Sequence, residues 1–97
     1  MLSSIPSQIV ESVETATGKK ITNFSFSSGG CINKGGKLAT STGFFFLKWN
    51  DLKKFPGMFM AEARGLSLLR RATVSVPEVV HVGNTTEFQF ILLEHIE

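Results

Sequence analysis

Residues 44–49 constrain the fold of this chain more than any other part of its sequence. They read Phe-Phe-Phe-Leu-Lys-Trp, so a strand built from them is apolar on both faces except at Lys48. A strand of this kind belongs in the interior of a sheet that is covered on both sides. A chain of 97 residues can form one such sheet around one hydrophobic core, which predicts a single domain over residues 1–97.

The residues before this segment predict one helix. Apolar side chains recur at spacings of four and three over about residues 4–17, which indicates an amphipathic helix. Ser3 or Ser4 is a suitable cap, and Gly18 is a suitable stop. The apolar stripe that would face the core consists of Ile5, Ile9, Val13 and Ala16.

The remaining elements complete an α+β pattern. A second helix is predicted over about residues 58–72, with an apolar stripe of Phe59, Ala63, Leu66 and Leu69. Alternating or short apolar runs predict four further strands, at residues 22–26, 37–41, 78–82 and 88–93. The order predicts a mostly antiparallel sheet of about five strands, with a helix at the N-terminus and another between strands three and four.

Two charged residues lie on the predicted apolar faces. Lys48 shares a strand face with Phe46, and Glu62 falls between Leu66 and Leu69 on the helical wheel. Taken singly, Lys48 could lie at a strand end and reach water, and Glu62 could be a solvated acid near a helix start. Buried charges are normally paired. If the helix packs over the sheet, each residue supplies the partner that the other needs.

A glycine-rich stretch separates the first two predicted strands. Residues 27–36 read Ser-Ser-Gly-Gly-Cys-Ile-Asn-Lys-Gly-Gly. Such a backbone can approach a ligand closely and point N–H groups at phosphate, although a flexible hairpin loop is the commoner explanation. The order strand, glycine-rich loop, strand lysine and helix glutamate is the order in which a kinase N-terminal lobe holds nucleotide phosphates.

Several segments together carry a family resemblance that covers essentially the whole chain. They are residues 29–35, 43–48, 59–63 with Leu66 and Leu69, 76–79, and 90–95. With these segments the chain resembles the N-terminal lobe of the fructosamine kinase (ketoamine kinase) family, within the protein-kinase-like and aminoglycoside-phosphotransferase-like group. The resemblance implies a kinase-like lobe that forms one unit. It consists of the N-terminal helix, followed by residues 21–97, which form the sheet and the second helix.

The resemblance also implies a set of ATP-binding residues. Lys48 would pair with Glu62 and with the ATP phosphates, and Leu93 would lie at the gate of the adenine pocket. The segment after Leu93 would offer backbone hydrogen bonds to adenine, through Glu94, His95 and Ile96. The glycine-rich loop would cover the phosphates with Gly29, Gly30, Cys31, Ile32 and Asn33.

The family's catalytic residues do not occur in this sequence. The family places its catalytic aspartate in a His-Gly-Asp segment, followed by a metal-binding asparagine and a second metal-binding aspartate, whereas Asp51 is the only aspartate here. We therefore expect a lobe of a longer enzyme that is inactive alone. The Mg²⁺ ligands of its ATP are expected in the C-terminal lobe, with no catalytic or metal residue in this one.

In the full enzyme the implied activity is phosphorylation of ketoamines, such as fructosamine adducts of proteins or amino acids. Two alternatives stay open: a lobe that phosphorylates aminoglycosides or other small molecules, and a non-catalytic binding module with the same fold. The sequence beyond residue 97 would distinguish them.

Charge, apolar runs and cysteine content limit the other partners. A formal net charge of +2 without a basic stripe predicts no nucleic-acid binding, and no apolar run is long enough to span a membrane. A single cysteine fits a reducing compartment, which predicts a cytoplasmic protein. Cys31 is either an inert loop residue or the site of a redox-linked dimer. His81 and His95 are dispersed, which argues against a zinc site.

Overall fold

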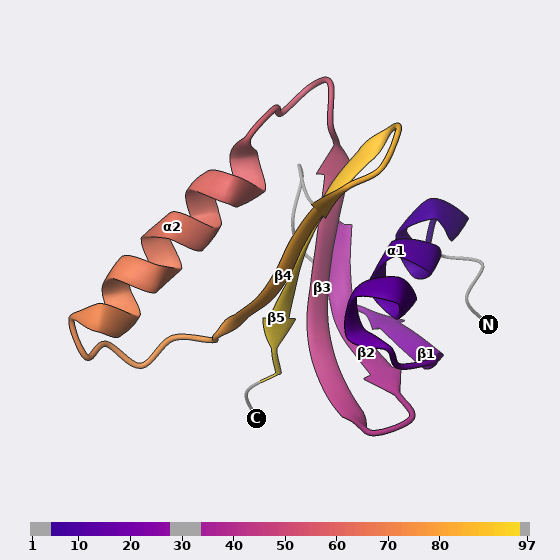
Figure 1. The fold of residues 1–97 in the computed structure, drawn as a ribbon, viewed down its shortest axis with the longest axis horizontal. Coiled ribbons are helices and arrows are strands. Elements are labelled where there is room, and N and C mark those ends of the chain that lie inside the picture. The colour runs from indigo at the N-terminus through magenta and orange to yellow at the C-terminus, as the bar shows by residue number, and fades with distance from the viewer. Residues whose placement is uncertain (1–4, 28–33, 96–97) are drawn as a thin grey trace.

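The computed structural model describes residues 5–27 and 34–95, which form two helices and five strands in an α+β domain (Figure 1). In chain order the elements are α1 (Ser7–Thr17), β1 (Ile21–Phe26), β2 (Lys34–Thr40), β3 (Gly43–Asp51), α2 (Met58–Arg71), β4 (Val79–Asn84) and β5 (Phe88–Glu94). This is the predicted order of elements, and the predicted α+β class is confirmed. No helix within the described ranges is long and apolar enough to cross a membrane.

The five strands form one antiparallel sheet in the order β1-β2-β3-β5-β4. β3 lies in the middle and pairs with β2 on one side and β5 on the other, as its two apolar faces predict. Within this sheet Phe46 is opposite Leu93, and Lys48 is opposite Ile91. Since cross-strand partners point to the same face, Lys48 shares a face with the apolar end of β5.

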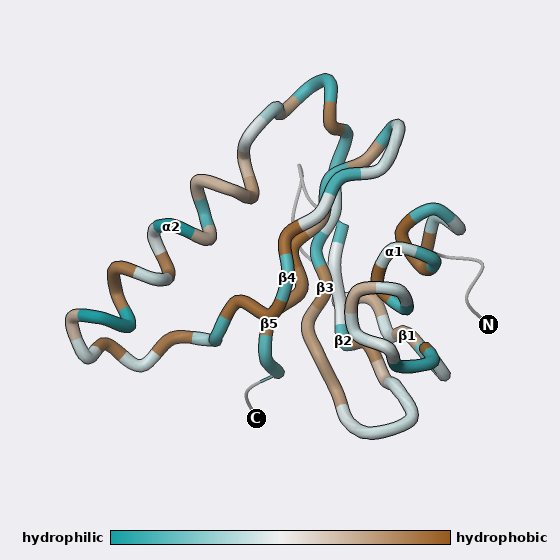
Figure 2. The backbone as a smooth tube through the Cα atoms, in the orientation of Figure 1, coloured by the Kyte–Doolittle hydropathy of each residue, from teal (hydrophilic) through white to brown (hydrophobic). Residues whose placement is uncertain are grey.

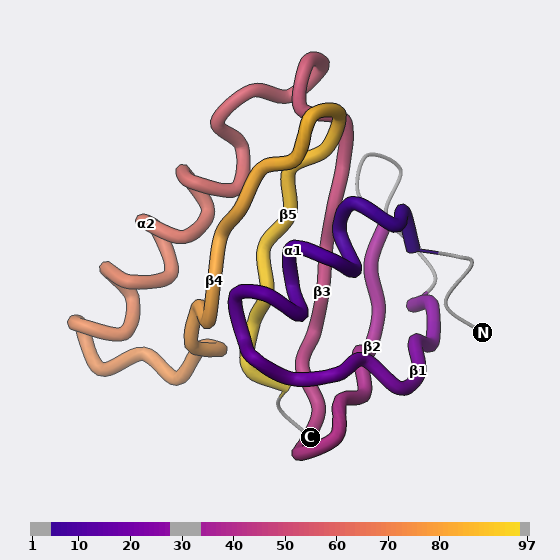
Figure 3. Tube along the Cα trace, turned by 45° about the vertical axis from the view of Figure 1, so that its right-hand side comes forward, coloured from indigo at the N-terminus to yellow at the C-terminus, as the bar shows by residue number. Residues whose placement is uncertain are grey.

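The two faces of the sheet carry different helices. α1 crosses one face over β3 and β5 (Figure 3), and α2 lies near the β4 edge on the other side. In Figure 2 hydrophobic residues recur along β4 and β5, and hydrophobic and hydrophilic residues alternate along α2. The core on the α1 face consists of Ile5, Ile9, Val13, Ile21, Phe24, Leu38, Leu47, Trp49, Phe90 and Leu92. The smaller core under α2 consists of Phe59, Ile91 and Leu93.

Each helix begins directly after a residue whose backbone is not in the right-handed helical conformation. α1 begins after Pro6, whose φ of −54° and ψ of 136° are extended, so the helix starts at Ser7 and not at residue 4. Its predicted stop is confirmed, because Gly18 adopts the left-handed conformation with φ 69°. α2 begins after Gly57, which has φ 76°. Glycine adopts this conformation without the steric cost that a side chain would add.

The second strand begins earlier than predicted. β2 starts at Lys34 and not at residue 37, so the last three residues of the predicted loop belong to the sheet. A Cβ added to Gly36 would lie 2.9 Å from Phe26 Cα on β1. Gly36 therefore allows β1 and β2 to approach closely, and here glycine indicates tight strand packing where the sequence suggested a loop.

Three predicted core residues are exposed, and the first is Ala16 near the C-terminal end of α1. Leu69 belongs to the predicted stripe of the second helix, yet it is 43% exposed. Ala63 and Leu66 pack against the core under α2. Leu69 lies nearer the C-terminal end of α2, where Figure 1 shows the helix diverging from the sheet. Phe44 is 51% exposed although β3 is central, because the α2 core begins further along the strand at Phe46.

Candidate functional site

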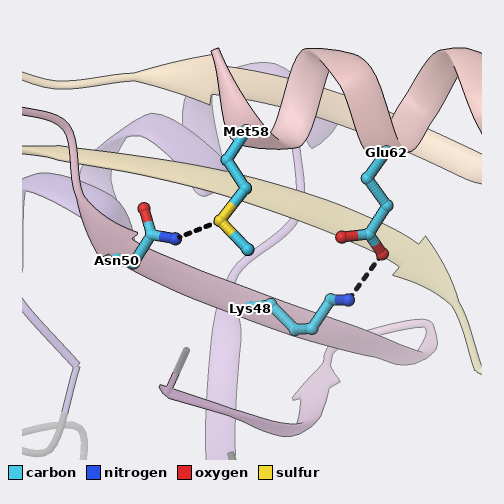
Figure 4. A network of polar contacts seen from close by, with 4 residues as sticks. All are labelled: Lys48, Asn50, Met58 and Glu62. Carbon is cyan, nitrogen blue, oxygen red and sulfur yellow. Dashed lines mark hydrogen bonds and ion pairs between the residues drawn. The ribbon is translucent and has the colours of Figure 1, made fainter. Parts of the chain in front are cut away.

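The two charged residues singled out by the sequence form an ion pair between the sheet and α2. Lys48 Nζ on β3 lies 2.5 Å from Glu62 Oε2 on α2 (Figure 4). The side chains are 23% and 28% exposed, so both are mostly withdrawn from water while one side stays accessible. The lysine ammonium also lies 6.0 Å from the centroid of the Phe59 ring. The predicted contact between the strand lysine and the helix glutamate is confirmed.

Gly35 permits the lysine to lie where it does. It is opposite Lys48 in the pairing of β2 with β3. A Cβ on Gly35 would lie 2.9 Å from Leu47 O and 3.0 Å from Lys48 Cγ. Any larger residue would therefore push on the β3 backbone and on the stem of the lysine. The glycine run in the sequence pointed to this position, but as part of a loop.

A buried amide pair lies one step further along the same face, and the sequence analysis did not identify it. Asn50 on β3 and Gln89 on β5 are opposite each other and are only 5% and 2% exposed. Gln89 Nε2 donates to Asn50 Oδ1 at 2.7 Å and to Phe55 O. Asn50 Nδ2 in turn donates to Met58 Sδ at 3.2 Å (Figure 4). The one signal in the sequence was a glutamine between the large apolar residues of β5.

The connection between β3 and α2 is held by hydrogen bonds along its length. Asp51 Oδ1 accepts from the backbone N–H groups of Lys53 at 2.8 Å and Lys54 at 3.1 Å. The N–H of Leu52 donates to Glu87 O in the β4–β5 turn at 3.0 Å. Asp51 is thus engaged in shaping a turn. These bonds fix where α2 starts relative to β3.

The predicted adenine-side residues lie at the other end of the α2 face. Leu93 is 6% exposed and packs in the core under α2. The Glu94 N–H donates to Glu78 O at 2.9 Å, and Glu94 Oε1 accepts from the Glu78 N–H at 3.0 Å. The His95 ring lies 6.3 Å from the Phe44 ring. The backbone N–H of Glu94 is therefore engaged within the sheet.

The structure thus brings some of the predicted site residues to one face and leaves others outside its description. Lys48, Glu62, Leu93 and His95 all belong to the α2 side of the sheet. Outside the described residues lie Gly29, Gly30, Cys31, Ile32, Asn33 and Ile96. His81 lies near the Phe90 ring at 5.8 Å, on the opposite face. Among residues 5–27 and 34–95, no three His, Cys, Asp or Glu side chains gather as a metal site.

Comparisons with known proteins agree with this architecture. The sequence profile described as "Fructosamine kinase" matches residues 2–97. The chain is 40% identical over 70 residues to a protein named as a ketoamine kinase in Vibrio parahaemolyticus, covering 71% of this chain and 24% of that protein. It is 40% identical over 80 residues to a chloroplastic protein-ribulosamine 3-kinase of Oryza sativa subsp. indica, covering 80% and 23%.

A solved structure gives the same result for the fold. A crystal structure described as a fructosamine-3-kinase from Haemophilus somnus 129PT superposes with a TM-score of 0.78 at 26% identity. The match covers 94% of this chain and 32% of that one. The fold is therefore that of a kinase-like N-terminal lobe, and the chain spans about a quarter of the length of the curated relatives it matches.

Proposed function

The chain belongs to the fructosamine kinase family, and we propose that it is the ATP-binding lobe of an enzyme that phosphorylates ketoamines. The observation that carries the proposal is the ion pair between Lys48 and Glu62. An isolated surface pair would contribute little to stability, whereas a lysine held by a glutamate on a partly covered face is suited to bind an anion. The family relation supplies the identity of that anion, the phosphate groups of ATP.

Lys48 has the chemistry that a phosphate site requires. An ammonium group has three N–H donors, and Glu62 accepts from one of them, so Lys48 can donate further hydrogen bonds to phosphate oxygens. Glu62 fixes the direction of the lysine side chain, and Gly35 allows its stem to lie flat against β2. The residues present therefore fit a bound nucleoside triphosphate. In this role Lys48 binds and orients the phosphates, and Glu62 keeps Lys48 extended toward them.

The rest of the nucleotide would extend from Lys48 along the same face. We assign Leu93 to the gate of the adenine pocket, since it lies two residues from Ile91, the partner of Lys48. Backbone groups of residues 94–96 would bond the base, with the engaged N–H of Glu94 excluded from that role. Residues 29–33 would cover the phosphates through backbone N–H groups. Mg²⁺ would accompany the ATP and neutralise phosphate charge, and we assign its ligands to residues outside this lobe.

We propose a ketoamine as the phosphate acceptor, because two relatives are named as a ketoamine kinase and a protein-ribulosamine 3-kinase. Contacts to the ketoamine and the catalytic base would come from the part of those enzymes that this chain does not span. We accordingly expect the 97-residue chain alone to transfer no phosphate. Turnover of ATP by the isolated chain would contradict this division of roles.

The test uses the complete gene product with ATP and a fructosamine adduct of lysine. Lys48→Met is expected to lower kcat/KM for ATP by about 10²–10³-fold, because a charge stabilising the transferred phosphate is lost. The matched control is Lys53→Met, which removes an exposed lysine from the connection before α2 and should leave turnover unchanged. Equal activity of the Lys48→Met variant and the parent would remove the phosphate role from Lys48. A parent protein that binds ATP without phosphorylating any ketoamine would favour a binding module.

A further inference from the structure

We propose that the buried amides of Asn50 and Gln89 are positioning residues that set the register of α2 along β3, so that Glu62 meets Lys48. The two amides act through Met58 and Phe55, at the point where the chain enters the helix. The kinetic part of the test rests on the proposed function, because it uses ATP turnover to report on the ion pair.

Two polar side-chain contacts between α2 and β3 have matching spacings. The strand offers Lys48 and Asn50, two residues apart on one face, or about 6.7 Å at the usual strand rise. The helix offers Glu62 and Met58, one turn apart, or about 6 Å at the usual helix rise. Figure 4 shows the two contacts side by side, Asn50 with Met58 and Lys48 with Glu62. Formation of the first contact therefore brings the second pair within reach.

Gln89 holds Asn50 in the orientation that this contact needs. Its amide group has two hydrogens, and both are used: one on Asn50 Oδ1 and one on Phe55 O. With its oxygen turned toward Gln89, the Asn50 amide directs its nitrogen at Met58. Phe55 O also accepts from the Met58 N–H at 3.2 Å. One glutamine on β5 thus determines both the direction of the Asn50 side chain and the position of Phe55, three residues before the start of α2.

Burial makes this arrangement selective. Gln89 is almost completely withdrawn from water, so an alternative packing of α2 that displaced Phe55 would leave one of the Gln89 amide hydrogens without its acceptor. The apolar contacts of α2, by comparison, are non-directional and would tolerate a shift along the sheet. A shift of one helical turn would place Met58 or Leu66 opposite Lys48 in place of Glu62. The amides therefore supply the specificity that the apolar core under α2 lacks.

The first experiment is a mutant cycle in the complete gene product, read as kcat/KM for ATP. Gln89→Met keeps the length of the side chain and removes its donors, and is expected to lower kcat/KM about three- to tenfold, the usual effect of losing one or two buried hydrogen bonds. In a Glu62→Gln background the same change should cost less than about twofold, because α2 then has no charge to deliver to Lys48. An equal loss in both backgrounds would assign Gln89 a purely structural role and overturn the proposal.

A second pair of variants covers the case in which Gln89→Met does not fold. Met58→Leu keeps the apolar volume and removes the sulfur that accepts from Asn50, whereas Met60→Leu makes the same change at a 53% exposed position of the same helix. Met58→Leu should lower kcat/KM for ATP about two- to fivefold, and Met60→Leu should not change it. Identical behaviour of the two leucine variants would overturn the proposal.

A measurement without turnover separates this proposal from the proposed function. In hydrogen–deuterium exchange, Gln89→Met should increase exchange in the first two turns of α2 and leave α1 at the parent level. Unchanged exchange in α2 would overturn the positioning role even if the enzyme were an active kinase. Conversely, a parent protein with no ATP-dependent turnover would refute the proposed function, and the exchange result would still decide whether the amides hold α2.

Discussion

The two faces of the sheet differ in what they bury. The α1 face buries a continuous apolar core in which Ile9, Val13, Leu38, Leu47, Phe90 and Leu92 have no exposed surface. The α2 face buries a smaller apolar cluster and two amides, and beside them it holds a half-buried ion pair. Since buried polar groups stabilise a fold less than apolar groups of the same shape, the α2 face gives up stability that the α1 face supplies.

This difference separates two tasks that one small domain has to combine. The α1 face needs only apolar volume, which non-directional packing fills. The α2 face has to hold Lys48 and Glu62 in one geometry, and this requires directional bonds from Asn50 and Gln89. The difference predicts that substitutions in the apolar core of the first face change stability strongly, and that substitutions of Lys48 or Glu62 on the second change stability weakly and function strongly.

The largest expected effect on stability comes from the α1 face of β3. Leu47→Ala should lower the free energy of unfolding by about 2–5 kcal/mol, because it removes a fully buried side chain and leaves a cavity. Urea denaturation of the 97-residue chain measures this. Leu68→Ala is the matched control on α2, where the side chain is 63% exposed and the expected change is within about 0.5 kcal/mol. Similar costs at the two positions would contradict the contribution of the α1-face core to stability.

The next effect is expected where β2 approaches the lysine. Gly35→Ala should lower the free energy of unfolding by about 1–3 kcal/mol, because the new methyl group would meet Leu47 O and Lys48 Cγ. Displacement of the lysine stem should also weaken ATP binding by the complete gene product. Urea denaturation and an ATP titration give the two values. Full stability of this variant would mean that β2 lies further from β3 than 2.9 and 3.0 Å contacts allow.

A stabilising change is expected on α2. Gly65 lies in the interior of the helix, and a Cβ there would meet nothing within 4 Å. Gly65→Ala should therefore raise the free energy of unfolding by about 0.5–1 kcal/mol, through helix propensity alone. Gly57→Ala is the control of opposite sign, since Gly57 has φ 76° and a side chain would strain it. Thermal unfolding of both variants measures the difference, and two changes of the same sign would contradict it.

Much of the fold follows from the sequence, because the spacing of apolar residues and the positions of charged residues can be read from short segments. The apolar period of residues 4–17 predicted a helix, and Ile9 and Val13 are buried as expected. The two apolar faces around Leu47 predicted the central strand, and two charges on apolar faces predicted the contact between Lys48 and Glu62. In each case the signal lies within about 15 residues of sequence or in complementary charge.

The remaining features depend on partners that are distant in the sequence. The sequence gives no sign that Asn50 is buried, because its burial depends on Gln89, 39 residues later. The exposure of Leu69 depends on where α2 leaves the sheet, which the helical period does not contain. The sequence suggested that Gly35 belongs to a loop, because a run of glycines does not reveal which strand backbone lies next to it. A sequence predicts which face a residue occupies, but only the fold determines what covers that face.

The smallest effect on stability is expected at the ion pair itself. In a double-mutant cycle of Lys48→Met and Glu62→Gln, the coupling free energy of unfolding should be about 0.2–1 kcal/mol, because both side chains keep partial contact with water. Urea denaturation of the four proteins gives this value, and Lys53→Met serves as the uncoupled control. A coupling of several kcal/mol would show that the pair is retained for stability, as the α1 core is. A small coupling beside a large loss of turnover would show that the α2 face keeps its charges for the ligand, since their contribution to the fold would not account for them.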